Sequence, residues 1–268
     1  MATQNPSPSI PPDDFRARRN YLPDEAFAWT SGSYGPPRDM IPEKEWSDLM
    51  SLPTDVLLRT ADNHGTQLAQ MQRLYSSWIM TLPIDTDKAP YIHNAAWDIG
   101  DDFNAAIFTT AHGYYRQGLA NLRSALDNMT IAAGFAVRQD DAGLQRWLSG
   151  TSEPPKFGNA RDWLTPTLGT GAKDVLNKLY KELSGYIHSQ TDAANVALWG
   201  GSNGPVWEPD SVRLVYVYFR DVMAMCLILL AIGWDDFSVP EEAWLLFERP
   251  DGIWSEALVA ELKQKFGA

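Results

Sequence analysis

The distribution of proline is the feature that most constrains the fold of this chain. Nine of the 18 prolines lie within the first 53 residues, whereas none occurs between Tyr91 and Glu153. Proline removes a backbone N–H and clashes with the preceding helical turn, so the first stretch cannot be mostly helical and the second can form a long helix. We therefore expect a disordered tail over residues 1–14, an aromatic-containing N-terminal arm packed on the body over residues 15–53, and a helical bundle domain over residues 54–268.

Helical periodicity after residue 53 predicts an all-α fold, an antiparallel helical bundle. Apolar residues recur there at spacings of three and four, as one buried helical face requires, and no alternating strand pattern of useful length occurs. Gly113 and Gly118 should weaken the longest helix without ending it. The expected long helices, packed antiparallel around one core, cover residues 54–82, 101–138, 173–189 and 210–232. Shorter helices are expected near residues 142–148, 160–164 (before Pro166), 240–247 and 254–266.

Composition limits the chemistry that the chain can carry. With 44% apolar residues it can bury a sizeable core, which excludes global disorder. Its one cysteine, Cys226, excludes an intramolecular disulfide framework and lies in an apolar run, so we expect an inert core thiol. The four histidines lack metal-ligand spacing, and an acidic helix start explains Asp98, Asp101 and Asp102 better than a cation site. No motif for a nucleotide-binding loop, a metalloprotease or a hydrolase is present, so neither metal nor cofactor is expected.

Charge and hydropathy indicate where the chain acts. The net charge of −12 disfavours broad adhesion to DNA, RNA or anionic membrane. Arg220 and Asp221 interrupt the apolar run 214–232, which favours a buried core helix over a membrane span. The N-terminus lacks the basic and apolar regions of a secretory signal. We expect a cytoplasmic protein that binds neither DNA nor membrane, and we leave binding to RNA open.

One polar stripe borders the apolar face of the predicted helix 101–138. His112, Arg116, Arg123 and Asp127 are spaced so that they fall within a band of roughly 60°. Arg123 and Asp127 form an i,i+4 pair that could simply support the helix. The alternative is that these half-buried charges line a groove and hold an anionic ligand.

A second polar stripe lies on the predicted helix 173–189. Lys181, Ser184 and His188 fall within a similar band beside the apolar face. His188 lies in the last turn, where the helix dipole favours a protonated imidazole, so both a structural and a functional role fit. If the two helices pack on each other, the two stripes should meet along one edge. That edge would carry more cations than carboxylates, which favours an anion or an acidic partner segment as ligand.

These two segments resemble a known family. Residues 115–127 carry Arg123 followed by Asp127, and residues 183–188 read Leu-Ser-Gly-Tyr-Ile-His, which places Tyr186 between Ser184 and His188. Both are similar to bacterial helical proteins of the HEPN-like group, over about residues 107–230. The resemblance implies an up-and-down bundle, often dimeric, and a role in toxin–antitoxin, phage-defence or stress systems. It also adds Tyr186 to the candidate ligand-binding residues.

The candidate functions differ in the role that they give to His188. The first is a non-catalytic interaction or ligand-sensing domain, with a homodimer, a protein partner or a small anionic ligand as binding partner. The second is a metal-independent ribonuclease with His188 as general acid or base and Lys181, or an arginine of the first stripe, for charge stabilisation. Active members of the group carry an arginine before that histidine. Here the helix has no arginine and offers Lys181, with six residues between it and His188. The third is an enzyme that acts on a small anionic metabolite beside Arg116 and Arg123.

Overall fold

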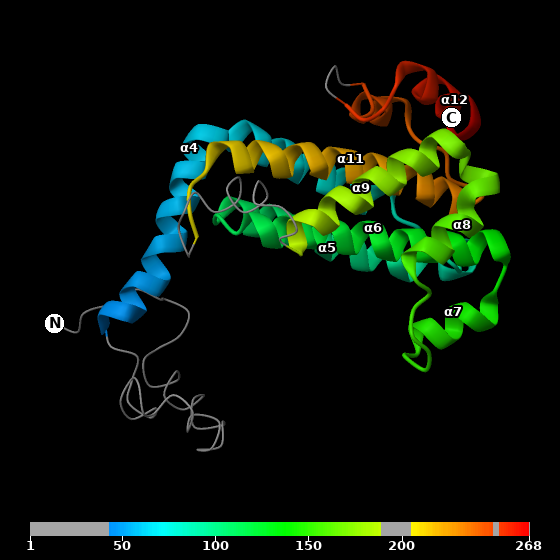
Figure 1. Cartoon of the computed structure of the whole chain (residues 1–268), viewed down its shortest axis with the longest axis horizontal. Helices are drawn as coiled ribbons and strands as arrows, with labels where there is room; N and C mark the ends of the chain where they lie inside the picture. The colour runs from blue at the N-terminus through cyan, green and yellow to red at the C-terminus, as the bar shows by residue number, and fades with distance from the viewer. Residues whose placement is uncertain (1–42, 189–204, 249–251, 268) are drawn as a thin grey trace.

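Helices account for the architecture of the chain (Figure 1). The computed structural model describes residues 43–188, 205–248 and 252–267. Within these ranges no strand occurs, and the single β-bridge joins Val239 to Gly267. The α-helices are α4 (Glu43–Thr81), α5 (His93–Ala111), α6 (Tyr115–Arg138), α7 (Asp141–Leu148), α8 (Phe157–Leu168), α9 (Thr170–Ile187), α11 (Pro209–Gly233) and α12 (Glu256–Phe266). Two 3-10 helices, η1 (Thr86–Lys88) and η2 (Glu241–Leu246), complete the elements. The predicted all-α bundle is confirmed.

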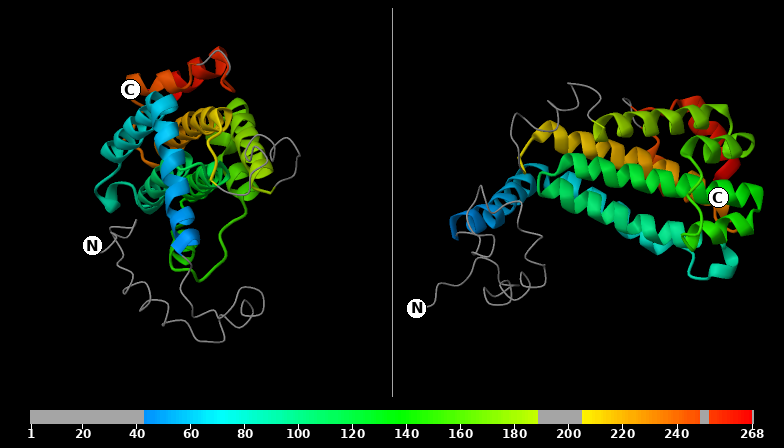
Figure 2. Two further views of the ribbon diagram at one scale, coloured as in Figure 1. Left: turned by 90° about the vertical axis from the view of Figure 1, so that its left-hand side faces the viewer. Right: turned by 60° about the horizontal axis from the view of Figure 1, so that its bottom comes forward.

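The helices α4, α5, α6, α9 and α11 all contribute to one apolar core, in which α9 packs against α6 (Figure 2). Consecutive helices α5 and α6 run antiparallel to each other (Figure 1). Helix α11 instead runs parallel to α6, because both begin at the same end of the bundle, where the backbone N–H of Glu208 donates to the Tyr115 hydroxyl at 2.9 Å. In the centre, the ring of Phe103 lies 5.7 Å from that of Trp78 and 5.2 Å from that of Phe219. These large buried side chains hold α4, α5 and α11 together.

The predicted helix 101–138 is two helices. Helix α5 ends at Ala111, α6 begins at Tyr115, and Gly113 between them has φ +81°. A Cβ on Gly113 would lie only 2.4 Å from the carbonyl oxygen of Val206, so this residue makes a tight corner under the incoming α11 segment. The expectation that Gly113 would not end the helix was wrong. His112 consequently caps α5 and does not share a helix with Arg116.

Two prolines lie inside helices, contrary to prediction. Helix α4 begins at Glu43 and contains Pro53, so the expected boundary between arm and bundle at residues 53 and 54 falls within one helix. Helix α8 continues through Pro166 to Leu168. Proline removes only one helical hydrogen bond, and the burial of Leu164 and Leu168 outweighs that loss in α8. The predicted tail 1–14 and the arm up to residue 42 lie outside the described residues.

Helix α11 forms one wall of the core. It is the one helix among the described residues that is long and apolar enough to cross a membrane, and 67% of its most apolar window is buried within the protein. Its apolar residues pack in the bundle core, as the sequence predicted. The C-terminal segment then folds back on α11, where the Trp254 indole N–H donates to the buried Asp221 carboxylate at 3.2 Å.

Candidate functional site

Arg123 connects helices α6 and α9. Its Nε donates to the Ser184 hydroxyl at 3.0 Å, and its Nη2 donates to the Tyr180 hydroxyl at 2.6 Å. Seven residues earlier on α6, Arg116 donates to the backbone carbonyl of Ile187. The expectation that the two polar stripes meet along one edge is therefore confirmed for Arg116, Arg123 and Ser184. The apolar faces of α6 and α9 bring them together, with Leu126 and Leu183 fully buried.

A cavity of about 720 Å³ opens at this edge, between α6, α8 and α9. We call it the α6–α9 groove. The first stripe contributes Asp127 to its lining and the second contributes Lys181. Helix α8 and the loop before it supply a third wall that includes Lys156, Phe157 and Arg161. Its volume lies within the range of roughly 300–1,000 Å³ that small-molecule sites occupy.

Asp127 contributes a partly exposed carboxylate to the lining of this groove. Its Oδ1 is buried and has no hydrogen-bond partner among the described residues. Burial raises the pKa of this carboxyl, and the positive charge of Arg123, 3.9 Å away, opposes the rise. The pair was expected either to support the helix or to line a groove, and its geometry fits both. The exposed part of the carboxylate accepts hydrogen bonds, so Asp127 suits a ligand that brings an N–H or O–H group.

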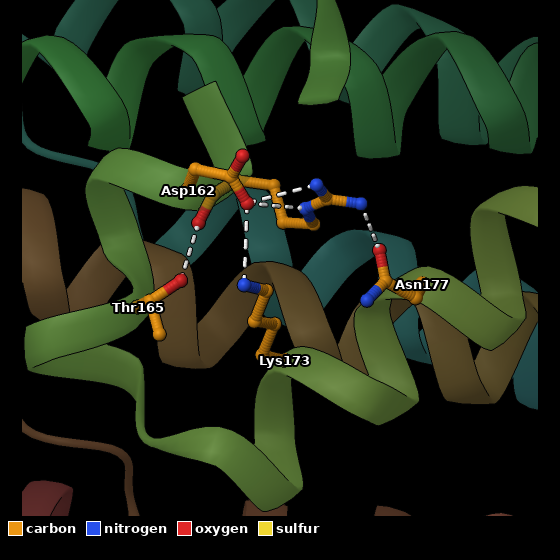
Figure 3. Close-up of polar contacts among 5 residues, drawn as sticks. Asp162, Thr165, Lys173 and Asn177 are labelled. Atoms are coloured by element: carbon orange, nitrogen blue, oxygen red, sulfur yellow. Dashed lines mark hydrogen bonds and ion pairs between the residues drawn. The ribbon is translucent and has the colours of Figure 1, made fainter. Parts of the chain in front are cut away.

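Arg161 reaches the same groove and is held in position by two neighbours (Figure 3). Its Nε and Nη2 donate to Asp162 at 3.0 and 2.8 Å, and its Nη1 donates to Asn177 on α9 at 2.7 Å. Lys173 also lies 3.2 Å from the same Asp162 oxygen. Hydrogen bonds from Arg161 and Lys173 lower the pKa of Asp162. The guanidinium of Arg161 is thereby anchored between α8 and α9.

Two further cations and a helix start surround the groove. Lys156 and Lys181 are exposed, and neither has an ion-pair partner within the part of the chain that the structure describes. Lys156 also occupies the N-cap position of α8 and makes no side-chain cap. The first N–H groups of a helix lack intrahelical partners and carry partial positive charge, which favours a nearby anion. Phe157 stacks on Tyr180 with ring centroids 3.6 Å apart and so fixes the start of α8 against α9.

Of the predicted site residues, only Asp127 and Lys181 line the groove. Arg116, Arg123 and Ser184 form the contact between α6 and α9 beside it, and the other three lie elsewhere. His188 is the C-terminal cap of α9. Its side chain is exposed, and its backbone N–H donates to the Ser184 carbonyl at 3.0 Å. It is absent from the lining of the groove. The ring of Tyr186 lies 5.8 Å from that of Tyr218 on α11, and His112 Nδ1 lies 2.8 Å from the Phe108 carbonyl. These residues therefore do not join Lys181 in one site.

Four lining residues were not identified from the sequence: Lys156, Phe157, Arg161 and Asn177. Only a short helical pattern was visible near them, and no spacing linked α8 to the two polar stripes. Among the described residues, no group of three or more His, Cys, Asp or Glu is placed to hold a metal ion. The fold and the groove together define a helical bundle with a cation-rich cavity at the side of its core.

Comparison with known proteins finds no relative of this chain. No family model, no curated protein and no solved structure matches this chain. The HEPN-like resemblance therefore stays a prediction, and the function is argued from the groove itself.

Proposed function

We propose that this chain is a ligand-sensing helical domain that binds a small anionic ligand in the α6–α9 groove. The observation that carries the proposal is a local reversal of charge. Lys156, Arg161 and Lys181 line the groove together with the uncapped start of α8, whereas Asp127 is the one carboxylate in the lining. The chain as a whole has a net charge of −12. Such a reversal attracts an anion and excludes most cations.

The lining also favours a particular kind of ligand. Its anionic group would lie between Lys181 and the α8 start, where ammonium and backbone N–H groups can donate. A hydrogen-bond donor elsewhere on the ligand would bind the partly exposed carboxylate of Asp127. The aromatic pair of Phe157 and Tyr180 forms part of the wall and offers apolar surface. A small acid that also bears an amino or hydroxyl group meets all three conditions.

The position of His188 favours binding over ribonuclease activity. A ribonuclease that used Lys181 as its cation would need His188 and Lys181 to act on one phosphate. His188 lies seven positions after Lys181, which corresponds to about 10 Å along the helix axis. Of the two, only Lys181 lines the groove. A homodimer, a protein partner and a place in a bacterial defence, toxin–antitoxin or stress system remain predictions from the resemblance.

Calorimetric titration with small acids tests the proposal. The panel contains inorganic pyrophosphate, amino- and hydroxy-dicarboxylates, and the uncharged amide of each dicarboxylate. We expect at least one acid to bind, its amide to bind about tenfold more weakly or worse, and Lys181→Gln to weaken the acid by a similar factor. Lys178→Gln is the matched control, because Lys178 is exposed on α9 and does not line the groove. Equal loss in both variants, or no binding by any acid, would contradict the proposal.

A further inference from the structure

A second cavity, of about 500 Å³, lies between α4, α11 and η2. We call it the α4–α11 cleft, and it shares no lining residue with the α6–α9 groove. Its wall includes the apolar side chains of Leu74, Trp78, Met223, Leu227 and Leu246. The indole N–H of Trp78 donates to the Ala96 carbonyl at 3.0 Å, so the polar atom of this buried side chain is already paired. Leu74, Ala243 and Leu245, which also line the cleft, are more exposed and supply apolar surface. The cleft is therefore built to remove a hydrocarbon or aromatic group from water.

Two arginines border this apolar wall. Tyr216 on α11 donates to Gln70 on α4, which fixes the register of the two parallel helices. One helical turn further along each helix stand Arg73 and Arg220, and both line the cleft. Arg73 has no hydrogen-bond or ion-pair partner among the described residues. It is exposed and free to bind a ligand.

Arg220 is positioned by its neighbours. Its Nη2 donates to the Leu245 carbonyl of η2 at 2.9 Å, and its guanidinium lies 5.9 Å from the Tyr216 ring. Other N–H groups of the guanidinium remain for a ligand. Against these two cations the lining holds one carboxylate, that of Glu242 on η2. The net positive charge of the lining again opposes the sign of the whole chain.

We infer that the α4–α11 cleft binds an amphipathic monocarboxylic acid. Its apolar part would cover Leu74 and Ala243, and its carboxylate would accept hydrogen bonds from Arg73 and Arg220. A guanidinium pairs well with a carboxylate, because its planar fork matches the two oxygens. A neutral apolar molecule would leave both guanidinium groups without a counter-charge, and an apolar cation would be repelled. This cleft therefore constitutes a binding site separate from the groove of the proposed function.

Titration calorimetry with octanoate, octanol and octylamine on the full chain tests the inference. We expect octanoate to bind about tenfold more tightly than octanol, and octylamine to bind more weakly than either. Arg73→Gln should remove the preference for octanoate over octanol. Ser77→Phe should abolish binding, because exposed Ser77 lines the cleft and a phenyl ring there would fill it. Arg59→Gln is the matched control, since Arg59 is exposed on the same helix outside the cleft.

Three results would overturn the inference. The first is equal affinity for octanoate and octanol, which would mean that the arginines do not select the ligand. The second is unchanged octanoate binding in Ser77→Phe, which would place the acid elsewhere. The third is a homodimer, detected by light scattering, that Leu245→Asp converts to a monomer. Leu245 lines the cleft and is 63% exposed, so that result would assign the cleft to a second copy of the chain. The inference would be supported if Ser77→Phe loses octanoate binding and Arg59→Gln retains it.

Discussion

The guanidinium carbon of Arg123 lies 4.8 Å from the centre of the Tyr180 ring, while its Nη2 donates to the hydroxyl of the same tyrosine. One side chain of α6 thus contacts both the face and the hydroxyl group of a side chain of α9. Together with the bond to Ser184, this makes Arg123 the main polar link between the two helices.

Arg123→Ala should therefore lower the free energy of unfolding by about 2 kcal/mol. The loss combines two hydrogen bonds to α9 with the contact to the Tyr180 ring, and it leaves the partly buried Asp127 without its cation. His188→Ala, at an exposed helix cap, should change stability by less than about 0.5 kcal/mol. Urea unfolding of both variants measures the difference. Equal midpoints would mean that Arg123 does not hold α9 on α6.

Asp102 should make the protein less stable as the pH rises. Burial raises its pKa to about 6, Asp98 and Asp101 add to the rise, and a hydrogen bond from Ser124 opposes it. Because the folded pKa exceeds the unfolded one, the native state binds the extra proton between roughly pH 4 and pH 6, and stability falls as pH rises through that window. Asp102→Asn should then be about 2 kcal/mol more stable than the parent at pH 7 and nearly equal at pH 4. Thermal melts across this range measure it, and a parallel shift at every pH would refute the assignment.

Truncation of core leucines should be costly on both sides of the α6–α9 contact. Leu126 and Leu183 are each 0% exposed, so Leu126→Ala and Leu183→Ala should each cost about 2–5 kcal/mol. Leu58→Ala serves as the control, since Leu58 on α4 is 58% exposed and should lose little. Denaturant midpoints for the three variants give the comparison. A small effect at Leu183 would indicate that α9 contributes little to the core.

Substitutions at Gly113 and Gly150 distinguish the cost of backbone strain from the cost of close packing. Both have positive φ, at +81° and +67°, but a Cβ on Gly150 meets nothing within 4 Å, whereas one on Gly113 meets the Val206 backbone. Gly150→Ala should cost about 1 kcal/mol, from the left-handed conformation alone. Gly113→Ala should cost at least about 2 kcal/mol more, because the corner must also move. Melting temperatures distinguish the two, and similar losses would count against the close contact at Gly113.

Cys226 should be unreactive in the folded chain. It is completely buried in α11, and burial raises the pKa of its thiol well above the ordinary value. Since the thiolate is the reactive form, a disulfide reagent such as DTNB should modify it only at the rate of unfolding. The same reagent should titrate one thiol at once in concentrated guanidinium chloride. Rapid reaction under native conditions would show that the core opens locally around α11.

Periodicity predicted the fold well because the core is built from amphipathic helices. The expected ends of α9 and α11 lie close to the observed Thr170–Ile187 and Pro209–Gly233. The break at Gly113 could not be predicted in this way. It depends on contact with Val206, far along the chain, and a glycine inside a helical pattern does not by itself indicate a corner.

Part of the candidate site followed from the sequence and part did not. Residue spacing placed Arg116, Arg123 and Asp127 beside one apolar face of α6, and placed Lys181 and Ser184 beside that of α9. Packing of those faces then brought the two stripes together. The wall of the groove formed by α8 was not predicted. Arg161 is positioned there by a tertiary contact with Asn177, which no local sequence pattern encodes. His188 was misplaced for a related reason: it lies beyond the last turn of α9, where the helix no longer sets the direction of the side chain.

The corner at Gly113 also bears on the order in which the chain folds. It joins α5 to α6 through three residues, so these two long helices can pair while the rest of the chain is still unfolded. Closing so short a loop costs little entropy, whereas α11 must be brought back across a much longer stretch of chain. We therefore expect the α5–α6 hairpin to form the folding nucleus, with α11 and α12 docking late. Substitutions in the α5–α6 contact should slow folding, and those in α12 should mainly speed unfolding.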